Sequence, residues 1–205
     1  MRYLLTSITL LLVGCASYPK KQGLTVSSET NRALTVPYFS NPETDYIYKA
    51  SIDVFNKHFS GLFIVKKTGE NIHRVAFTTE MGTKIFDFSF SESQFTVNFI
   101  QEELNRKPLL KILEQDFRTL ICEKPDIAKS FSYDGRSVLK GNINNQAYFF
   151  YLDSANNLIE TVYPKRGKAS IVYSFSKINS DIAEEIKIKH QSLQMTINLK
   201  SFKKS

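Results

Sequence analysis

The chain has 205 residues, of which 42% are apolar and 23% charged, and its formal net charge is +7. This composition excludes an intrinsically disordered chain and a membrane protein with several spans, and the length suits one generous domain. Sixteen Phe and ten Tyr, without any Trp, favour β-strands. The two cysteines, Cys15 and Cys122, can form at most one disulfide, so the fold does not depend on disulfides.

Residues 1–14 are predicted to be the signal peptide of a bacterial lipoprotein. A positive start, Met1-Arg2, precedes the apolar stretch 4–13, which is too short to span a bilayer. This stretch ends in Leu12-Val13-Gly14-Cys15, which resembles a lipobox, the motif whose cysteine is acylated once the signal has been cut off. Several acyl chains on Cys15 would anchor the protein durably to a membrane. An ordinary signal peptide with a coincidental cysteine is the alternative.

The residues after this cysteine predict where the anchored protein resides. Ala16, in place of an acidic residue, implies transport to the outer membrane under the sorting rules of Gram-negative lipoproteins. Lys20-Lys21 stands where surface-exported lipoproteins carry an acidic run, so the domain is expected to face the periplasm. With Cys15 acylated, Cys122 is a lone thiol, which we expect to be a small buried hydrophobe and not a nucleophile.

Residues 15–45 are predicted to be the lipidated cysteine and a flexible tether. The stretch 16–45 is rich in Ser, Thr, Asn and Pro and has no sustained apolar periodicity. A flexible chain of about 30 residues has a root-mean-square length of about 30 Å. The folded domain is therefore expected to span 46–205, to receive no core residue from the tether, and to reorient on its anchor.

From Tyr46 onward, apolar residues alternate with period two, which predicts half-buried antiparallel strands. The first group of strands covers residues 46–54, 59–65, 75–77, 86–90 and 95–99, with turn signals at 67–71 and 80–82. Strands resume at 146–152, 158–163, 168–175, 182–189 and 193–199. The sequence therefore predicts a mainly β fold with about ten strands.

One amphipathic helix is predicted between the two groups of strands. Apolar residues recur there at offsets of three and four, at Leu109, Ile112, Leu113, Phe117, Leu120 and Ile121. Asn105 can cap the start of this helix, and Pro125 closes the segment. Ten strands need a strongly curved sheet, because a flat one leaves long edges and an uncovered face. A curved sheet with a helical lid would enclose an apolar cavity suited to acyl chains, and ordinary core packing is the alternative.

Motifs for catalysis, metal binding and nucleotide binding do not point to an enzyme. His58, His73 and His190 are far apart in sequence and are expected to be strand-face residues. The S-x-x-K spacing at Ser137 and the K-T-G at Lys67 occur in the wrong order for a penicillin-binding serine enzyme. Phosphate-binding glycine motifs do not occur. We therefore expect no catalytic residue, no metal, no cofactor and no nucleic-acid partner.

Several segments resemble the LolB family, outer-membrane lipoproteins that receive other lipoproteins. They are Phe59-Ser60-Gly61-Leu62-Phe63, the stretch 74–83 with the alternating Phe residues after it, and the late strands 183–188 and 193–200. The resemblance covers roughly residues 46–200. It implies an open antiparallel half-barrel with a helical lid over an apolar cavity for acyl chains. The family also has an apolar residue in a protruding turn that assists transfer into the membrane, and Met81-Gly82 occupies that place.

The resemblance implies a function in lipoprotein transport. The chain is expected to be a monomer that accepts acylated lipoproteins from a LolA-like periplasmic carrier and inserts them into outer-membrane phospholipid. Glu80, Leu120 and Glu123 replace the family's usual Pro, Trp and Gly, which leaves open a relative with another lipophilic cargo. The other alternative is a structural or assembly lipoprotein that binds a partner through its sheet. The residues expected to line the acyl-chain cavity are Phe63, Val65, Phe77, Phe86, Phe88, Phe99, Tyr148, Phe150 and Ile197, unless the opposite strand face does so.

Overall fold

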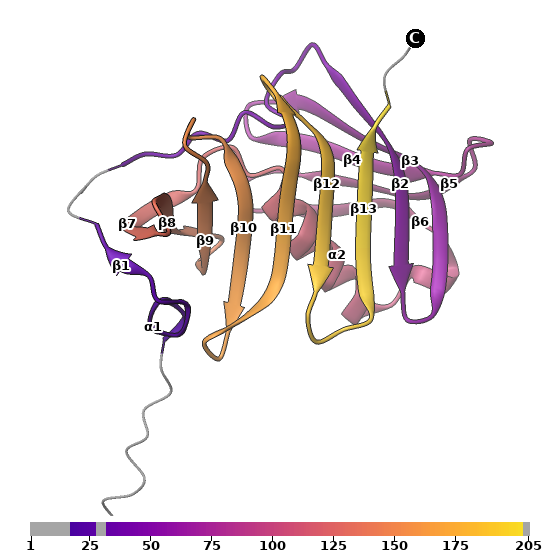
Figure 1. Ribbon diagram of the computed structural model, residues 1–205. Coiled ribbons are helices and arrows are strands. Elements are labelled where there is room, and N and C mark those ends of the chain that lie inside the picture. Colours follow the sequence, from indigo (N-terminus) through magenta and orange to yellow (C-terminus); the bar gives the residue numbers. More distant parts are fainter. Residues whose placement is uncertain (1–16, 28–31, 203–205) are drawn as a thin grey trace, which may run out of the picture.

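A computed structural model describes residues 17–27 and 32–202 of the chain. The predicted signal peptide and Cys15 lie outside the described residues. Thirteen strands form one open antiparallel sheet with the spatial order β1-β7-β8-β9-β10-β11-β12-β13-β2-β3-β4-β5-β6 (Figure 1). The strands are β1 (Thr25–Val26), β2 (Asp45–Val54), β3 (Lys57–Gly69), β4 (Ile72–Thr78), β5 (Lys84–Phe90), β6 (Phe95–Ile100), β7 (Asp126–Tyr133), β8 (Arg136–Ile143), β9 (Gln146–Leu152), β10 (Leu158–Lys165), β11 (Lys168–Asn179), β12 (Ile182–His190) and β13 (Met195–Ser201).

The mainly β class and the antiparallel sheet are confirmed, but the sheet has more strands than predicted. Period-two alternation located β2 to β6 and β9 to β13, and it missed β1, β7 and β8. A hairpin turn at Asp134-Gly135 joins β7 to β8, and both residues have positive φ, 48° and 72°. Asp-Gly is a strong signal for a turn of this type, so this hairpin was recognisable from the sequence.

The helices are α1 (Tyr18–Gln22), the short 3₁₀ helix η2 (Glu102–Leu104) and α2 (Lys107–Leu120). Helix α2 is the predicted amphipathic helix, and it lies in the concavity of the sheet (Figure 1). Pro108 stands in its first turn, where the missing N–H costs nothing, whereas Arg106 and not Asn105 precedes the helix. The apolar side of α2 packs with the inward-facing side chains of the sheet in one large core cluster.

Strand β2 shows how the alternation builds this core. Tyr46, Tyr48 and Ile52 point inward and are buried, whereas Lys49 and Asp53 point outward and are exposed. Each fully buried large apolar side chain contributes roughly 1.5–3 kcal/mol. The concave face of the sheet and α2 therefore supply most of the stability of the domain.

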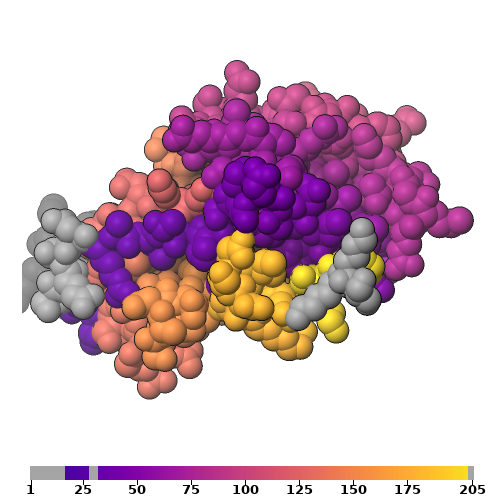
Figure 2. All heavy atoms as spheres, turned by 90° about the horizontal axis from the view of Figure 1, so that it is seen from above, coloured from indigo at the N-terminus to yellow at the C-terminus, as the bar shows by residue number. Residues whose placement is uncertain are grey.

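The expected flexible tether is wrong for the described part of residues 15–45. Strand β1 pairs with β7 at one edge of the sheet, and helix α1 packs on the outer face, where Tyr18 joins a second apolar cluster with Phe131, Val138, Phe149 and Val162. The segment 32–44 then crosses one end of the curved sheet (Figure 2). Its residues Leu34, Val36, Tyr38 and Phe39 are buried in the main core. The tether prediction failed because the alternation of Leu34, Val36 and Tyr38 covers only five residues, yet the open end of the sheet offers these side chains a place to bury.

Candidate functional site

The concave interior beneath α2 contains most of the residues predicted to line a cavity. Eight of the nine are buried in the main core cluster: Phe63, Val65, Phe77, Phe86, Phe88, Tyr148, Phe150 and Ile197. The sequence therefore identified the inward face of these strands correctly. A role of these side chains in acyl-chain binding remains a prediction.

Phe99 was expected in the interior, and the structure places it elsewhere. Its side chain is 42% exposed on the edge strand β6. A register shift in the β5–β6 pairing places Phe99 opposite Asp87, and the ammonium group of Lys84 lies 5.9 Å from the Phe99 ring. The shift interrupts the alternation of β6, so Phe95 and Ile100, and not Phe99, pack against the core.

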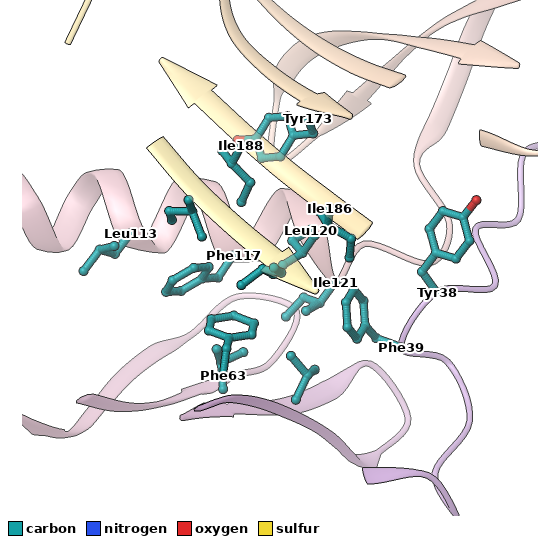
Figure 3. Packing of buried hydrophobic residues seen from close by; sticks show 14 of the residues in the cluster. Tyr38, Phe39, Phe63, Leu113, Phe117, Leu120, Ile121, Tyr173, Ile186 and Ile188 are labelled. Carbon is teal, nitrogen blue, oxygen red and sulfur yellow. The ribbon is translucent and has the colours of Figure 1, made fainter. Parts of the chain in front are cut away.

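Helix α2 fills the interior with its own side chains. The Phe117 ring centroid lies 5.2 Å from that of Phe63 and 5.5 Å from that of Phe86. Figure 3 shows Leu113, Phe117 and Leu120 pointing from the helix into the space between the two halves of the sheet. The predicted open cavity is therefore occupied by a packed core in this structure.

A small cavity remains under the N-terminal half of α2. Its volume is about 10 Å³, enough for about one water molecule. All its lining residues are apolar: Ile52, Val54, Phe59, Phe77, Ile85, Phe86, Leu104, Leu109, Leu113 and Met195. Ligand pockets usually measure about 300–1,000 Å³, so an acyl chain could enter here only if α2 moved.

The C-terminal half of α2 is fixed to the sheet by buried polar contacts. The Tyr173 hydroxyl donates to Asp116 at 3.1 Å, and His190 Nε2 lies 2.8 Å from the other carboxylate oxygen. The Thr119 hydroxyl also donates to the Tyr148 hydroxyl at 3.0 Å. Burial raises the pKa of the Asp116 carboxyl. Because these groups have lost their water, their mutual contacts hold this half of the helix in one position.

The N-terminal half of α2 is attached differently. Among the described residues, the side-chain hydrogen bonds from α2 to the sheet begin at Gln115, and the preceding turns rest on Leu109 and Leu113. One exposed ion pair, Lys57 with Glu103 at 2.6 Å, connects η2 to β3 at this end. Exposed ion pairs contribute only about 0–1 kcal/mol. This half of the helix is therefore held by apolar contacts that another apolar group can replace.

The opposite end of the interior is closed by the segment 32–44. The Tyr38 hydroxyl donates to the Leu158 carbonyl at 2.8 Å, and the Tyr38 ring stacks on Phe175 at 5.1 Å. His73 Nε2 lies 3.1 Å from the Phe39 carbonyl oxygen, and burial lowers the pKa of His73. The interior therefore has one end closed by polar and aromatic contacts and one end, the mouth, covered by the N-terminal half of α2.

Met81 and Gly82 lie in the turn that joins β4 to β5, the strands that contribute Phe77 and Ile85 to the small cavity at this mouth. The side chain of Met81 is 95% exposed, and Gly82 has a φ of 85°, in the region that favours glycine. The Thr79 amide donates to the Thr83 carbonyl at 2.9 Å, and the Thr83 amide donates to the Thr79 hydroxyl at 3.0 Å, which closes the hairpin. Met81 therefore covers no core, and its insertion into a membrane remains a prediction.

Other chemistry is not assembled within residues 17–27 and 32–202. That part of the chain holds no group of three potential metal ligands, and none of its helices is long and apolar enough to cross a membrane. The three histidines lie on strands, as expected. Burial raises the pKa of the Cys122 thiol to about 11, so it stays protonated and is a poor nucleophile at neutral pH.

A second hollow lies on the outer face of the sheet. It measures about 520 Å³ and extends over β2 and β11 to β13, where Ser51, Ser174 and Ser176 are too small to fill the surface. Lysines stand around these serines, and the hollow is open to water. It is separated from the interior by the sheet itself.

Sequence reasoning missed the polar contacts that hold α2. Asp116 follows Leu113 by three residues and precedes Leu120 by four, so it stands on the apolar side of the helix. His190 continues the inward alternation of Ile186 and Ile188. A charged or polar residue on an apolar face requires a buried hydrogen-bond partner. The positions of Asp116 and His190 on apolar faces were therefore a signal that the two side chains contact each other.

The sequence matches no protein-family model and no curated protein. The crystal structure of a LolA superfamily protein from Nitrosomonas europaea superposes with a TM-score of 0.50 at 9% identity, over 82% of this chain and 88% of that one. A DUF1329 family protein from Desulfovibrio piger and a Vibrio parahaemolyticus domain named as an outer membrane lipoprotein-sorting protein both give TM-scores of 0.39. The Desulfovibrio piger protein is 9% identical over 77% of this chain and 83% of its own. The Vibrio parahaemolyticus domain is 10% identical over 78% of this chain and 83% of its own. The chain therefore shares its fold with a member of the LolA superfamily.

Proposed function

We propose that this chain is an outer-membrane lipoprotein, facing the periplasm, that accepts the acyl chains of other lipoproteins from a soluble carrier and releases them into the membrane. The observation that carries the proposal is the uneven attachment of α2. Buried polar groups hold one half of the helix, and the other half covers an apolar interior through apolar contacts alone.

Acyl-chain binding requires the N-terminal half of α2 to move away from the sheet. Leu109 and Leu113 would leave their places, and the methylene groups of the acyl chain would take them. Because one apolar contact replaces another, the exchange changes the free energy little. The contacts of Asp116 would persist and act as the hinge of this motion.

Release into the bilayer needs no chemical energy in this scheme. A bilayer stabilises each buried methylene by about 0.8 kcal/mol, so it is a deeper sink for acyl chains than a protein interior that must first open. Met81, exposed beside the mouth, would enter the membrane interface and guide the chains out. The protein would therefore act as a binding protein and not as an enzyme.

The shared fold with a LolA superfamily structure supports this proposal at the level of architecture. The second candidate, an assembly lipoprotein that binds a partner strand, is favoured by a different observation. Strand β6 is an edge of the sheet, and Val97 and Phe99 are exposed on it. In that case the interior would be a core only, and a partner would add a strand to β6.

Transfer of an acylated protein from a soluble carrier to liposomes tests the proposed function. The wild type should accelerate transfer, and Met81→Glu should bind the cargo normally but deliver it several-fold more slowly, because a carboxylate is repelled by anionic headgroups. Met81→Leu is the matched control and should deliver at the wild-type rate. Equal transfer with and without the protein would contradict the proposal, and equal transfer by Met81→Glu and Met81→Leu would remove the role of Met81.

A further inference from the structure

One end of the sheet presents several turns along a single edge. Antiparallel register brings the turns at residues 55–56, 166–167 and 191–194 to the same end of their strands. Helix α1 lies beside them, and together they line the lower edge of the molecule in Figure 1. The mouth of the interior is at this end, because Val54 and Met195 line it and lie directly next to two of these turns.

Two of these turns expose large apolar side chains. Phe55 is 51% exposed and Leu193 is 38% exposed. The Phe55 amide donates to the Gln194 carbonyl at 3.0 Å, so the two turns are neighbours. Phe55 has a φ of 45°, which bulky residues rarely adopt. A phenyl ring held in such a backbone conformation and left in water contributes little to folding, which points to a contact outside the domain.

The other part of the edge is strongly basic. Lys20 and Lys21 of α1 and Lys165, Arg166 and Lys168 around the β10–β11 turn are all exposed. Lys21 Nζ lies 3.5 Å from the Arg166 carbonyl oxygen, so the two groups form one cluster. Residues 17–23 and 164–168 contain no Asp or Glu, and within the described chain none of the five cations forms an ion pair. This cluster attracts phosphate-bearing surfaces.

Helix α1 is fixed to the sheet next to the point where the chain would enter the membrane. The Tyr18 ring lies 4.6 Å from Phe149, and the Tyr18 hydroxyl lies 3.0 Å from the Tyr151 hydroxyl. Cys15 precedes Tyr18 by three residues, so even an extended chain places it within about 11 Å of α1. An anchor at Cys15 would therefore hold this edge close to the bilayer.

We propose that this edge docks on the membrane. Phe55 and Leu193 enter the interface, and the five basic residues contact anionic phospholipid headgroups. The inference rests on the proposed function for the membrane location of the protein. It adds an orientation, because docking by this edge turns the mouth beneath α2 toward the bilayer, so that acyl chains pass between protein and membrane without crossing water.

Tryptophan fluorescence of the full chain isolated from membranes tests the orientation. The chain contains no Trp, so Phe55→Trp introduces a single emitter. Phe202→Trp is the matched control, because Phe202 is 45% exposed and its amide donates to the Ile47 carbonyl at the other end of β2. With vesicles containing brominated phosphatidylglycerol, the emission of Trp in the Phe55→Trp chain should shift to the blue and be quenched, and that of the control should not. Equal quenching of the two emitters, or none at either site, would overturn the proposal.

A charge variant provides a second test that does not depend on the fluorophore. A Cys15→Ala chain should bind phosphatidylglycerol vesicles and not phosphatidylcholine vesicles. Adding Lys20→Ala, Lys21→Ala and Arg166→Ala to this chain should weaken its binding to phosphatidylglycerol vesicles about 100-fold, because each charge contributes about fivefold. Equal binding to both vesicle types, or no effect of the substitutions, would contradict a headgroup site. Melting curves confirm that each variant is folded. Acyl-chain transfer is measured separately, so a protein that transfers acyl chains but does not bind the anionic vesicles would overturn this inference alone.

Discussion

Replacement of Phe117 by Ala tests whether α2 fills an interior that an acyl chain can occupy. Phe117 is completely buried, and its ring contacts Phe63, Phe86 and Phe88. Phe→Ala substitutions in such sites cost about 3–5 kcal/mol. For a protein of this size, about 4 kcal/mol corresponds to a fall in melting temperature of about 8–16 °C. The substitution should also leave an apolar cavity beneath α2, so that a long-chain amphiphile displaces the N-terminal half of the helix more easily.

Thermal melts with and without a fatty acid measure both effects. A ligand at 100 times its dissociation constant stabilises a protein by about 2.7 kcal/mol, so the fatty acid should restore much of the lost stability of Phe117→Ala. Phe149→Ala is the matched control, because Phe149 is equally buried but belongs to the outer cluster beside α1. It should lose similar stability and gain no extra response to the ligand. Equal responses of the two variants would refute the idea that the space beneath α2 is the acyl-chain site.

Three further predictions concern the elements around the interior. Asp116→Ala should lower the free energy of unfolding, measured by chemical denaturation, by about 3–5 kcal/mol, because it leaves His190 buried without its partner. Asp116→Asn should lower it less, and equal losses would contradict the importance of the hydrogen bonds. Gly61→Ala should destabilise the domain by at least about 2 kcal/mol, because its Cβ would lie 1.9 Å from the Thr78 carbonyl oxygen, and an unchanged melting temperature would show that β4 can shift. Burial lowers the pKa of His73 below its usual value near 6.5, so at acidic pH the unfolded chain binds more protons than the folded chain. The free energy of unfolding should therefore fall from pH 7 to pH 5, and His73→Gln should reduce the dependence of this free energy on pH.

The sequence predicted the strands with regular alternation and the amphipathic helix, because both patterns are local. Burial of Tyr38 and Phe39 was not predictable in this way, since it depends on the open end of a sheet that forms from distant strands. The displacement of Phe99 has a similar cause, because a register shift in one hairpin reverses the face of a strand without any change in composition.

The candidate site was predictable in part. The inward face was read correctly from the alternation of Phe and Tyr, and the exposed position of Met81 followed from the turn around Gly82. The packed state of the interior was not predictable, because periodicity shows which side chains face inward but not whether the helix fills the space between them. Asp116 and His190 on apolar faces carried a signal that a search for buried polar pairs would have found.

Photo-crosslinking by an acylated lipoprotein that carries a diazirine on its acyl chain tests the central claim most directly. After transfer from the carrier and irradiation, mass spectrometry locates the attached residues. We expect adducts beneath the N-terminal half of α2, on Phe77, Ile85 and Leu113, which line the mouth of the interior. Adducts confined to the outer face of the sheet, or to the edge strand β6, would contradict an acyl-chain site beneath α2.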